Sequence, residues 1–237
     1  MSNPTSFEYN SIIPSSLTWK NIIMMGRSND PIKRFELGIK AMGSIIKKIP
    51  TCEMNIVSTS SDKLEKLIKE LNLEKSVRIV GFNKNIDIYL QNSSLHILTS
   101  LSESYAMVLG ETKLFGIPSI ICGLDYLALA KGWTVIIYDD NPETIAKEAI
   151  KILENNGLRK YLGKEARKSM KKQRNEIIVK KWVKLLLSVY KGDDEAYHQL
   201  DLGNKNKINK KEAEKILKNQ LILLQKRIPD LKEITFE

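Results

Sequence analysis

The chain has 237 residues, 42% of them hydrophobic and 28% charged, which suits a folded domain with its own core. No apolar run approaches the roughly 20 residues of a membrane-spanning helix, and residues 1–16 lack lysine, arginine and any long apolar stretch. We therefore expect no signal or transit peptide and a cytoplasmic location. The net charge of +10 favours anionic partners, but no nucleic-acid-reading motif accompanies it, so nucleic-acid binding is the weaker interpretation.

Short apolar runs rich in β-branched residues alternate with amphipathic stretches along the first two thirds of the chain. The runs predict six strands, at residues 22–25, 54–57, 77–80, 95–98, 119–122 and 134–138. Helical spacing between them predicts helices at residues 35–46, 64–71, 105–115 and 142–153. Such alternation with near-continuous apolar strands predicts an α/β fold, a doubly wound, Rossmann-like parallel sheet covered on both faces.

Further helices are predicted after this pattern, at residues 157–172, 176–190 and 210–227, with a polar loop between the last two. Trp182, Leu186 and Val189 share an apolar stripe, which we expect to be exposed. The densest cluster of lysines and arginines, residues 167–184, indicates either a solvated helix face or a patch for anions or anionic membranes. We divide the chain into a linker-like segment 1–20, a nucleotide-binding domain 21–190 and a tail 191–237.

Ligands of a doubly wound sheet bind beyond the carboxyl ends of its strands. The loop after the first strand holds Gly26, Arg27 and Lys33, which suits a phosphate or, equally, a turn with surface cations. The loop after the fourth strand holds Glu103, and Glu111 lies in the early turns of the helix that we expect from residue 105 or 106. The first main-chain N–H groups of that helix can bind phosphate, and the two carboxylates can accept hydrogen bonds from hydroxyl groups.

Several other chemistries are disfavoured by the sequence. No G-x-G-x-x-G follows the first strand and no G-x-x-x-x-G-K-[ST] occurs, which argues against dinucleotide enzymes and P-loop NTPases. No nucleophile–histidine arrangement is readable; we expect His96 to be structural and place His198 in a tail loop. Cys52 and Cys122 are expected to be buried free thiols. Residues 201–212 have the length of a calcium-binding loop but lack its ligands.

Three segments together resemble glycosyltransferase family 4, the retaining GT-B enzymes of the glycosyl transferases group 1. Gly26-Arg27 followed by Lys33 resembles the family's phosphate-binding segment, and Val80-Gly81-Phe82 resembles its turn before the nucleobase pocket. Glu103 and Glu111, followed by residues 116–118 as Gly-Ile-Pro, resemble its Glu-x7-Glu motif and the strand entry after it. The resemblance covers residues 3–190 and implies the C-terminal, donor-binding half of a two-domain enzyme.

The resemblance implies a role for each matching residue. Arg27 and Lys33 would bind the donor pyrophosphate and stabilise the departing nucleoside diphosphate, a charge stabilisation typical of such catalysis. Glu103 would bind the donor sugar and Glu111 the ribose. We count Arg27, Lys33 and Glu103 as catalytic. The other donor-binding residues that it implies are Gly26, Gly81, Phe82, Ser104, Tyr105, Ala106, Met107, Val108 and Glu111.

The resemblance also implies that the enzyme needs no metal or other cofactor. We therefore interpret Asp139 and Asp140 as part of a loop and not as metal ligands. Two positions depart from the family: Ala106 stands where glycine is usual, and Trp133 where a small residue is usual.

The expected activity is transfer of a hexosyl group from a nucleotide sugar, a partner that the resemblance implies. Because the acceptor-binding half of the family's enzymes has no counterpart in the sequence, we expect no transfer by the chain alone. The expected partner is a separate acceptor-domain protein or a second copy, bound through the stripe of Trp182. The alternative is a non-catalytic nucleotide-binding or interaction protein derived from such an enzyme.

Overall fold

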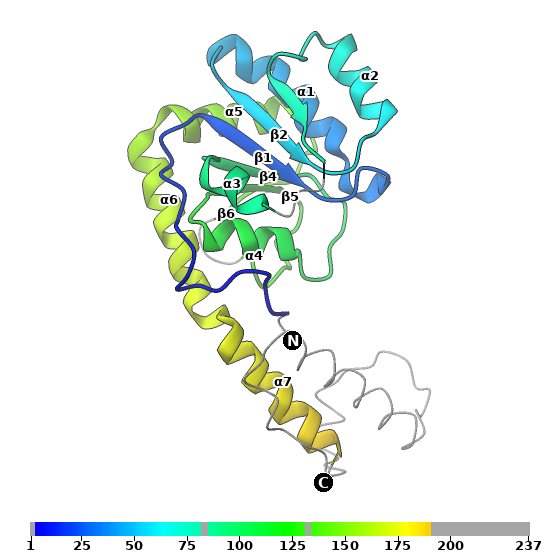
Figure 1. Ribbon diagram of the computed structural model, residues 1–237. Coiled ribbons are helices and arrows are strands. Elements are labelled where there is room, and N and C mark those ends of the chain that lie inside the picture. The colour runs from blue at the N-terminus through cyan, green and yellow to red at the C-terminus, as the bar shows by residue number, and fades with distance from the viewer. Residues whose placement is uncertain (1–2, 82–84, 131–133, 191–237) are drawn as a thin grey trace. The chain divides into compact units, whose positions relative to one another are not determined.

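The computed structural model describes residues 3–81, 85–130 and 134–190. Residues Ser2–Asn175 form one compact unit, and a second unit contains the chain from Glu176 onward, of which helix α7 (Asn175–Tyr190) is described. Figure 1 shows the elements of both units. Phe82, Trp133, His198, residues 201–212 and the helix expected at residues 210–227 lie outside the described residues. The boundaries expected at residues 20 and 190 stay predictions.

The first unit is built on a parallel sheet of six strands in the order β3-β2-β1-β4-β5-β6. The predicted α/β doubly wound fold, with six strands, is confirmed. The strands are β1 (Asn21–Met25), β2 (Glu53–Val57), β3 (Val77–Ile79), β4 (Leu95–Leu98), β5 (Ser119–Cys122) and β6 (Thr134–Ile137). The chain builds outward from β1 to β3 and then returns to place β4 on the other side of β1. Ligands of such sheets bind where the strand order reverses, and we call the region beyond the carboxyl ends of β1 and β4, between the loops that follow them, the crevice.

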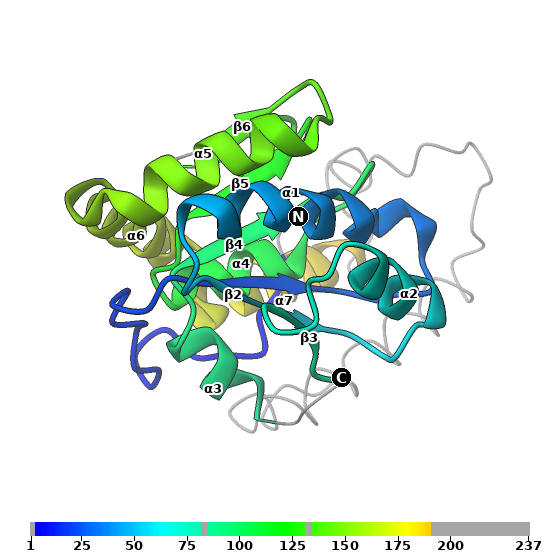
Figure 2. The ribbon, with the colours of Figure 1, turned by 90° about the horizontal axis from the view of Figure 1, so that it is seen from above.

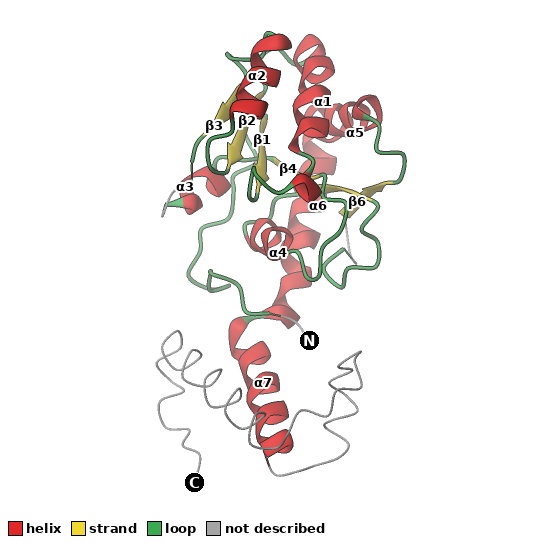
Figure 3. Ribbon diagram, turned by 90° about the vertical axis from the view of Figure 1, so that its right-hand side faces the viewer, coloured by secondary structure: helices red, strands yellow, loops and turns green. Residues whose placement is uncertain are grey.

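Helices cover both faces of the sheet, as Figures 2 and 3 show. One face packs against α1 (Phe35–Lys48), α2 (Asp62–Glu70) and α5 (Pro142–Glu154). The other packs against α3 (Ile86–Gln91) and α4 (Met107–Leu114). Helix α6 (Asn156–Ser169) contacts both α5 and α4, so it links the two layers of helices. A short 3-10 helix, η2 (Met170–Gln173), follows it.

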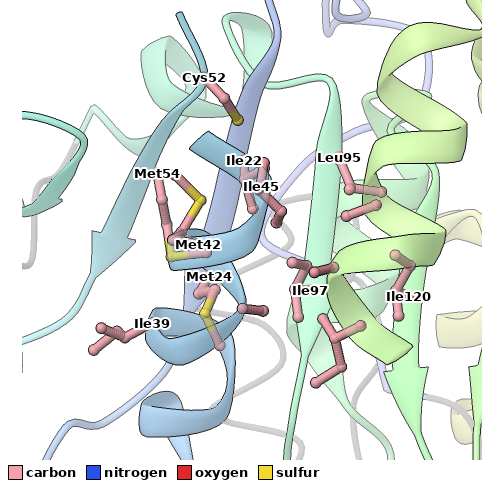
Figure 4. Packing of buried hydrophobic residues seen from close by; sticks show 14 of the residues in the cluster. Ile22, Met24, Ile39, Met42, Ile45, Cys52, Met54, Leu95, Ile97 and Ile120 are labelled. Atoms are coloured by element: carbon pink, nitrogen blue, oxygen red, sulfur yellow. The ribbon is translucent and has the colours of Figure 1, made fainter. Parts of the chain in front are cut away.

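The core is divided by the sheet because successive strand residues point to opposite faces. On β1, Ile22 and Met24 join the cluster under α1 and α5, while Ile23 and Met25 join the cluster under α4. Figure 4 shows the first cluster, in which Met42 and Ile45 of α1 lie against the strands. Both faces of β4 and β5 are buried, which explains the unbroken apolar runs in the sequence.

Three expectations about the helices are corrected. Helix α3 was not expected, because it has six residues of which only Leu90 is buried, too little for a readable period. Helix α4 begins at Met107 rather than at residue 105 or 106, because Ala106 takes a left-handed conformation at φ 57°. The stripe on α7 is not fully exposed, since Leu186 is buried and Trp182 half-buried.

Residues 5–17 pack along the first unit and are held at several points. Thr5 bonds to the Asn175 side chain, and the rings of Phe7 and Phe115 meet edge to face at 5.0 Å. The Arg167 guanidinium lies 4.6 Å from the Tyr9 ring centroid and donates to the carbonyl oxygen of Tyr9. Arg167 is therefore a packing residue within the basic cluster, whereas its neighbour Lys168 is exposed.

The end of α4 lies against α6 at a point where no side chain fits. Gly116 adopts φ +71° there, and the N–H groups of Gly116 and Ile117 cap the helix by bonding to the carbonyls of Lys113 and Thr112, both at 3.0 Å. A Cβ on Gly163 of α6 would overlap the Gly116 carbonyl oxygen and lie 2.9 Å from a methyl group of Leu17. Two backbones thus touch without intervening side chains.

We therefore expect Gly163→Ala to lower the free energy of unfolding by about 1–3 kcal/mol, the usual range for overpacking. The matched control is Gly43→Ala in α1, where a Cβ meets nothing within 4 Å. That change should raise the free energy of unfolding by up to about 1 kcal/mol, because alanine favours a helix interior over glycine. Chemical denaturation of both variants measures the sign of each change in the free energy of unfolding. Equal effects would contradict the close approach.

Candidate functional site

The candidate site lies in the crevice beyond β1 and β4. Two loops flank it, residues 26–34 after β1 and residues 99–106 after β4. They are tied together directly, since the Leu101 N–H donates to the Ile32 carbonyl and the Thr99 hydroxyl to the Lys33 carbonyl. The two loops that the sequence singled out are therefore neighbours, 65 to 70 positions apart in the chain.

The first loop turns sharply and ends in a short 3-10 helix, η1 (Pro31–Lys33). Asp30 caps this helix by accepting from the Ile32 N–H at 3.1 Å. Gly26 has φ +153°, a backbone conformation that favours glycine, and it lies within contact distance of the Lys33 stem. The side chain of Lys33 is 17% exposed.

Lys33 and Glu103 form an ion pair across the crevice. Lys33 Nζ donates to Glu103 Oε1 at 2.5 Å, and the Ser100 hydroxyl donates to the same oxygen at 2.7 Å. Both charged side chains are less than one fifth exposed, which strengthens the pair relative to a surface one. Ser100 was not among the residues that the sequence assigned to the site, although it stands directly after β4.

Arg27 does not take part in this pair. Its guanidinium bonds to Asp30 at 3.3 Å, and its side chain is 71% exposed. Of the two cations predicted to bind a pyrophosphate, Lys33 is held inside the crevice, and Arg27 stands at its rim. An exposed, long side chain with a single weak partner can move to a ligand at small cost.

The start of α4 presents main-chain N–H groups beside Glu103. Ala106 is buried and left-handed, so it reverses the chain into the helix, a conformation that costs an alanine about 1–2 kcal/mol. Met107 and Val108 supply N–H groups of the first turn, which have no partner within a helix. The chain before them is exposed at Ser104 and half-buried at Tyr105. This helix start can accept an anion.

Glu111 lies one turn farther along α4 and is half-buried. Burial raises the pKa of its carboxyl group, and hydrogen bonds from the side chain and main chain of Ser6 lower it in part. The residue thus faces the N-terminal segment, a partner that the sequence did not indicate. Gly81, at φ +70°, follows the edge strand β3, with nothing within 4 Å of an added Cβ.

A second ion pair joins three loops at this edge of the sheet, and nothing in the sequence predicted it. Arg34 donates to Asp140 through two nitrogens, at 2.6 and 2.8 Å, and through Nε to the Thr99 carbonyl at 2.8 Å. Both Arg34 and Asp140 are left-handed, at φ 47° and 46°. Asp140 raises the pKa of Arg34 by accepting these bonds. The only signal in the sequence was that Arg34 and Asp140 each stand in a polar loop that follows a predicted strand.

The remaining titratable candidates have structural roles. His96 is fully buried, its Nδ1 near the hydroxyls of Ser119 and Thr112, and burial lowers its pKa to about 3. Cys52 and Cys122 are free and buried, as predicted, and burial raises their pKa values to about 12 and about 11.

In the part of the chain that the structure describes, no group of three or more histidine, cysteine, aspartate or glutamate side chains could hold a metal ion, and no helix is long and apolar enough to cross a membrane. Asp139 instead accepts from the Thr144 hydroxyl at 2.6 Å.

An open groove of about 620 Å³ runs along the outer edge of the sheet, lined by α2 and β3. Its lining residues include Glu65, Lys66 and Arg78 and none of the predicted site residues. It is open and lined largely by charged side chains, so the crevice at β1 and β4 remains the better candidate for chemistry.

The chain is similar to several known glycosyltransferases. N-acetyl-alpha-D-glucosaminyl L-malate synthase of Bacillus anthracis is 27% identical over 169 residues, which is 68% of this chain and 44% of that protein. Anabaena HepE, crystallised with UDP and glucose, superposes with a TM-score of 0.67 at 17% identity over 77% of this chain and 55% of that one. The C-terminal domain of the Francisella tularensis glycosyl transferase group 1 protein LpcC gives 0.57 at 16% identity, over 70% and 92%.

The chain spans less than half the length of the curated relatives that it matches. The family model of the glycosyl transferases group 1 matches residues 10–169, which include the whole sheet, both crevice loops and Glu111. The chain belongs to the glycosyl transferases group 1 family and has the GT-B type of fold.

Proposed function

We propose that this chain is the donor-binding domain of a retaining glycosyltransferase that moves a hexosyl group from a nucleoside diphosphate sugar to an acceptor. The observation that carries the proposal is the Lys33–Glu103 pair at the reversal point of the sheet. One member is a cation suited to a phosphate oxygen, and the other is an acceptor suited to a sugar hydroxyl. A nucleotide sugar offers both groups next to each other, at the bond that is broken.

Each residue has a proposed role in that reaction. Lys33, joined by Arg27 from the rim, stabilises the negative charge that develops on the leaving diphosphate. The N–H groups of Met107 and Val108 hold a phosphate oxygen at the helix start. Glu103 orients the sugar, and Glu111 takes the ribose in exchange for Ser6. Because Lys33 and Arg27 supply the positive charge, we propose that donor binding needs no metal.

The proposal extends to the acceptor. In a two-domain enzyme the acceptor is positioned by a second domain that closes over the donor, and positioning supplies much of the rate. The likeness to the C-terminal domain of LpcC supports the proposal that this chain corresponds to the C-terminal domain of such an enzyme. We therefore propose that transfer needs a separate acceptor-binding protein or domain.

Calorimetry with UDP-glucose, UDP-N-acetylglucosamine, GDP-mannose and ADP-glucose, and with free UDP, GDP and ADP, in the presence of a chelator, tests the proposal. We expect one nucleotide to bind, with the sugar adding to its affinity. No binding of any ligand at millimolar concentration would refute the proposal. Binding of the nucleotide with no contribution from the sugar would favour a non-catalytic nucleotide-binding protein.

A further inference from the structure

The connection between β5 and β6 brings a phenol to the main chain of Glu103. Tyr126 Oη accepts a hydrogen bond from the Glu103 N–H at 3.0 Å and donates to the Glu103 carbonyl oxygen at 3.1 Å. Among the described residues, no other main-chain group bonds to the main chain of Glu103. Tyr126 therefore satisfies both main-chain groups of a residue in an otherwise exposed loop.

The segment that carries Tyr126 is firmly held. Leu124, Leu127 and Leu129 are buried in the core, and short turns bond Leu127 to Leu124 and Ala130 to Leu127, at 3.2 and 2.9 Å. From α4, the buried Lys113 donates to the Leu129 carbonyl at 2.5 Å. Since its neighbours face the core, Tyr126 faces outward and is 59% exposed. Such a segment can serve as a fixed support for the loop that it touches.

Glu103 is consequently fixed at both of its ends. Its carboxylate accepts from Lys33 and Ser100, and its main chain is held by Tyr126. When a nucleotide sugar binds, Lys33 turns to the phosphate, and one of the carboxylate's partners is lost. The support from Tyr126 does not involve the carboxylate and therefore persists. A carboxylate that stays in place binds a hydroxyl more tightly, because its ordering entropy is already lost.

We propose that Tyr126 is a positioning residue for sugar recognition, which holds the main chain of Glu103 so that its carboxylate meets the donor sugar. The inference rests on the proposed function, since it requires that Glu103 contact the sugar. It assigns a role to the β5–β6 connection that neither the motif spacing nor the family match indicates.

The test is Tyr126→Phe in the full chain, with Tyr161→Phe on α6 as the matched control. Calorimetry uses UDP-glucose, UDP-N-acetylglucosamine, GDP-mannose and ADP-glucose, each against its free nucleoside diphosphate. For the sugar nucleotide that the wild type binds, we expect Tyr126→Phe to weaken binding about fivefold to tenfold, the size of the ordering cost that the Glu103 side chain then pays on binding. The free diphosphate should bind unchanged, and Tyr161→Phe should change neither.

A double-variant comparison separates positioning from a general structural role. In the background of Glu103→Ala, which removes the carboxylate, Tyr126→Phe should cause no further loss, because its effect passes through the Glu103 side chain. Equal weakening of both ligand types, or losses that add in the double variant, would overturn the role of Tyr126 alone. Failure of the wild type to bind any of these ligands would overturn the proposed function and this inference together.

Discussion

Lys33→Ala is expected to weaken binding of a free nucleoside diphosphate about tenfold to a hundredfold. The change removes a charge-assisted hydrogen bond, worth roughly 1.5–3 kcal/mol, from a side chain that is held within the crevice. It also leaves Glu103 without its cation, so that the carboxylate repels the incoming phosphate. Arg27→Ala should cost less, because Arg27 is 71% exposed and must leave Asp30 to reach a ligand.

Calorimetry with UDP, GDP and ADP and with the matching nucleosides measures this ranking. Lys48→Ala is the matched control, since it removes an exposed lysine from the other end of α1. Nucleoside binding should be the same in all of these proteins. A larger loss from Arg27→Ala than from Lys33→Ala would mean that the arginine, and not the lysine, makes the main phosphate contact.

The second expected result is that Glu103→Gln weakens binding of the nucleotide sugar but not of the free diphosphate. Glu103→Gln should weaken binding of the nucleotide sugar about tenfold, because the sugar loses a hydrogen bond to a charged acceptor. The same change should leave binding of the free diphosphate equal or tighter, since Lys33 no longer has to break an ion pair at 2.5 Å. The difference between the two ligands is therefore the quantity to measure.

Two other variants frame this experiment. Glu74→Gln changes an exposed glutamate between α2 and β3 and should affect neither ligand. Glu111→Gln should weaken every ribose-bearing ligand alike, with or without phosphate. If Glu103→Gln instead weakened the diphosphate and the nucleotide sugar equally, Glu103 would act by supporting the loop, and the assignment of the sugar to it would fail.

The fold was predictable from the sequence because burial on both faces leaves unbroken apolar runs on strands such as β4 and β5. The placement of Lys33 and Glu103 at one edge followed from the rule that ligands meet the carboxyl ends of parallel strands. Helix α3 was not predicted, because one buried leucine in six residues gives no hydrophobic periodicity.

The parts of the site that were missed depend on contacts between distant loops. Arg34 and Asp140 are 106 positions apart, and each alone looks like a surface charge. Ser6 was missed for the same reason, since nothing in the sequence links it to Glu111. The left-handed turn at Ala106 was not readable either, because alanine seldom adopts it and normally signals a helix.

The crevice has an electrostatic character that the composition of the chain conceals. Although the chain carries a net charge of +10, the three cations of the β1 loop are each matched with a carboxylate: Arg27 with Asp30, Lys33 with Glu103 and Arg34 with Asp140. The side chains of this loop are thus close to neutral in sum and offer little to a simple anion. Inorganic phosphate would have to separate an ion pair and leave a carboxylate without a partner. A phosphate that carries a sugar also brings hydroxyl groups, which can replace the lysine as hydrogen-bond donors to that carboxylate. Discrimination against the abundant small anions of a cell is then built into the resting pairs themselves.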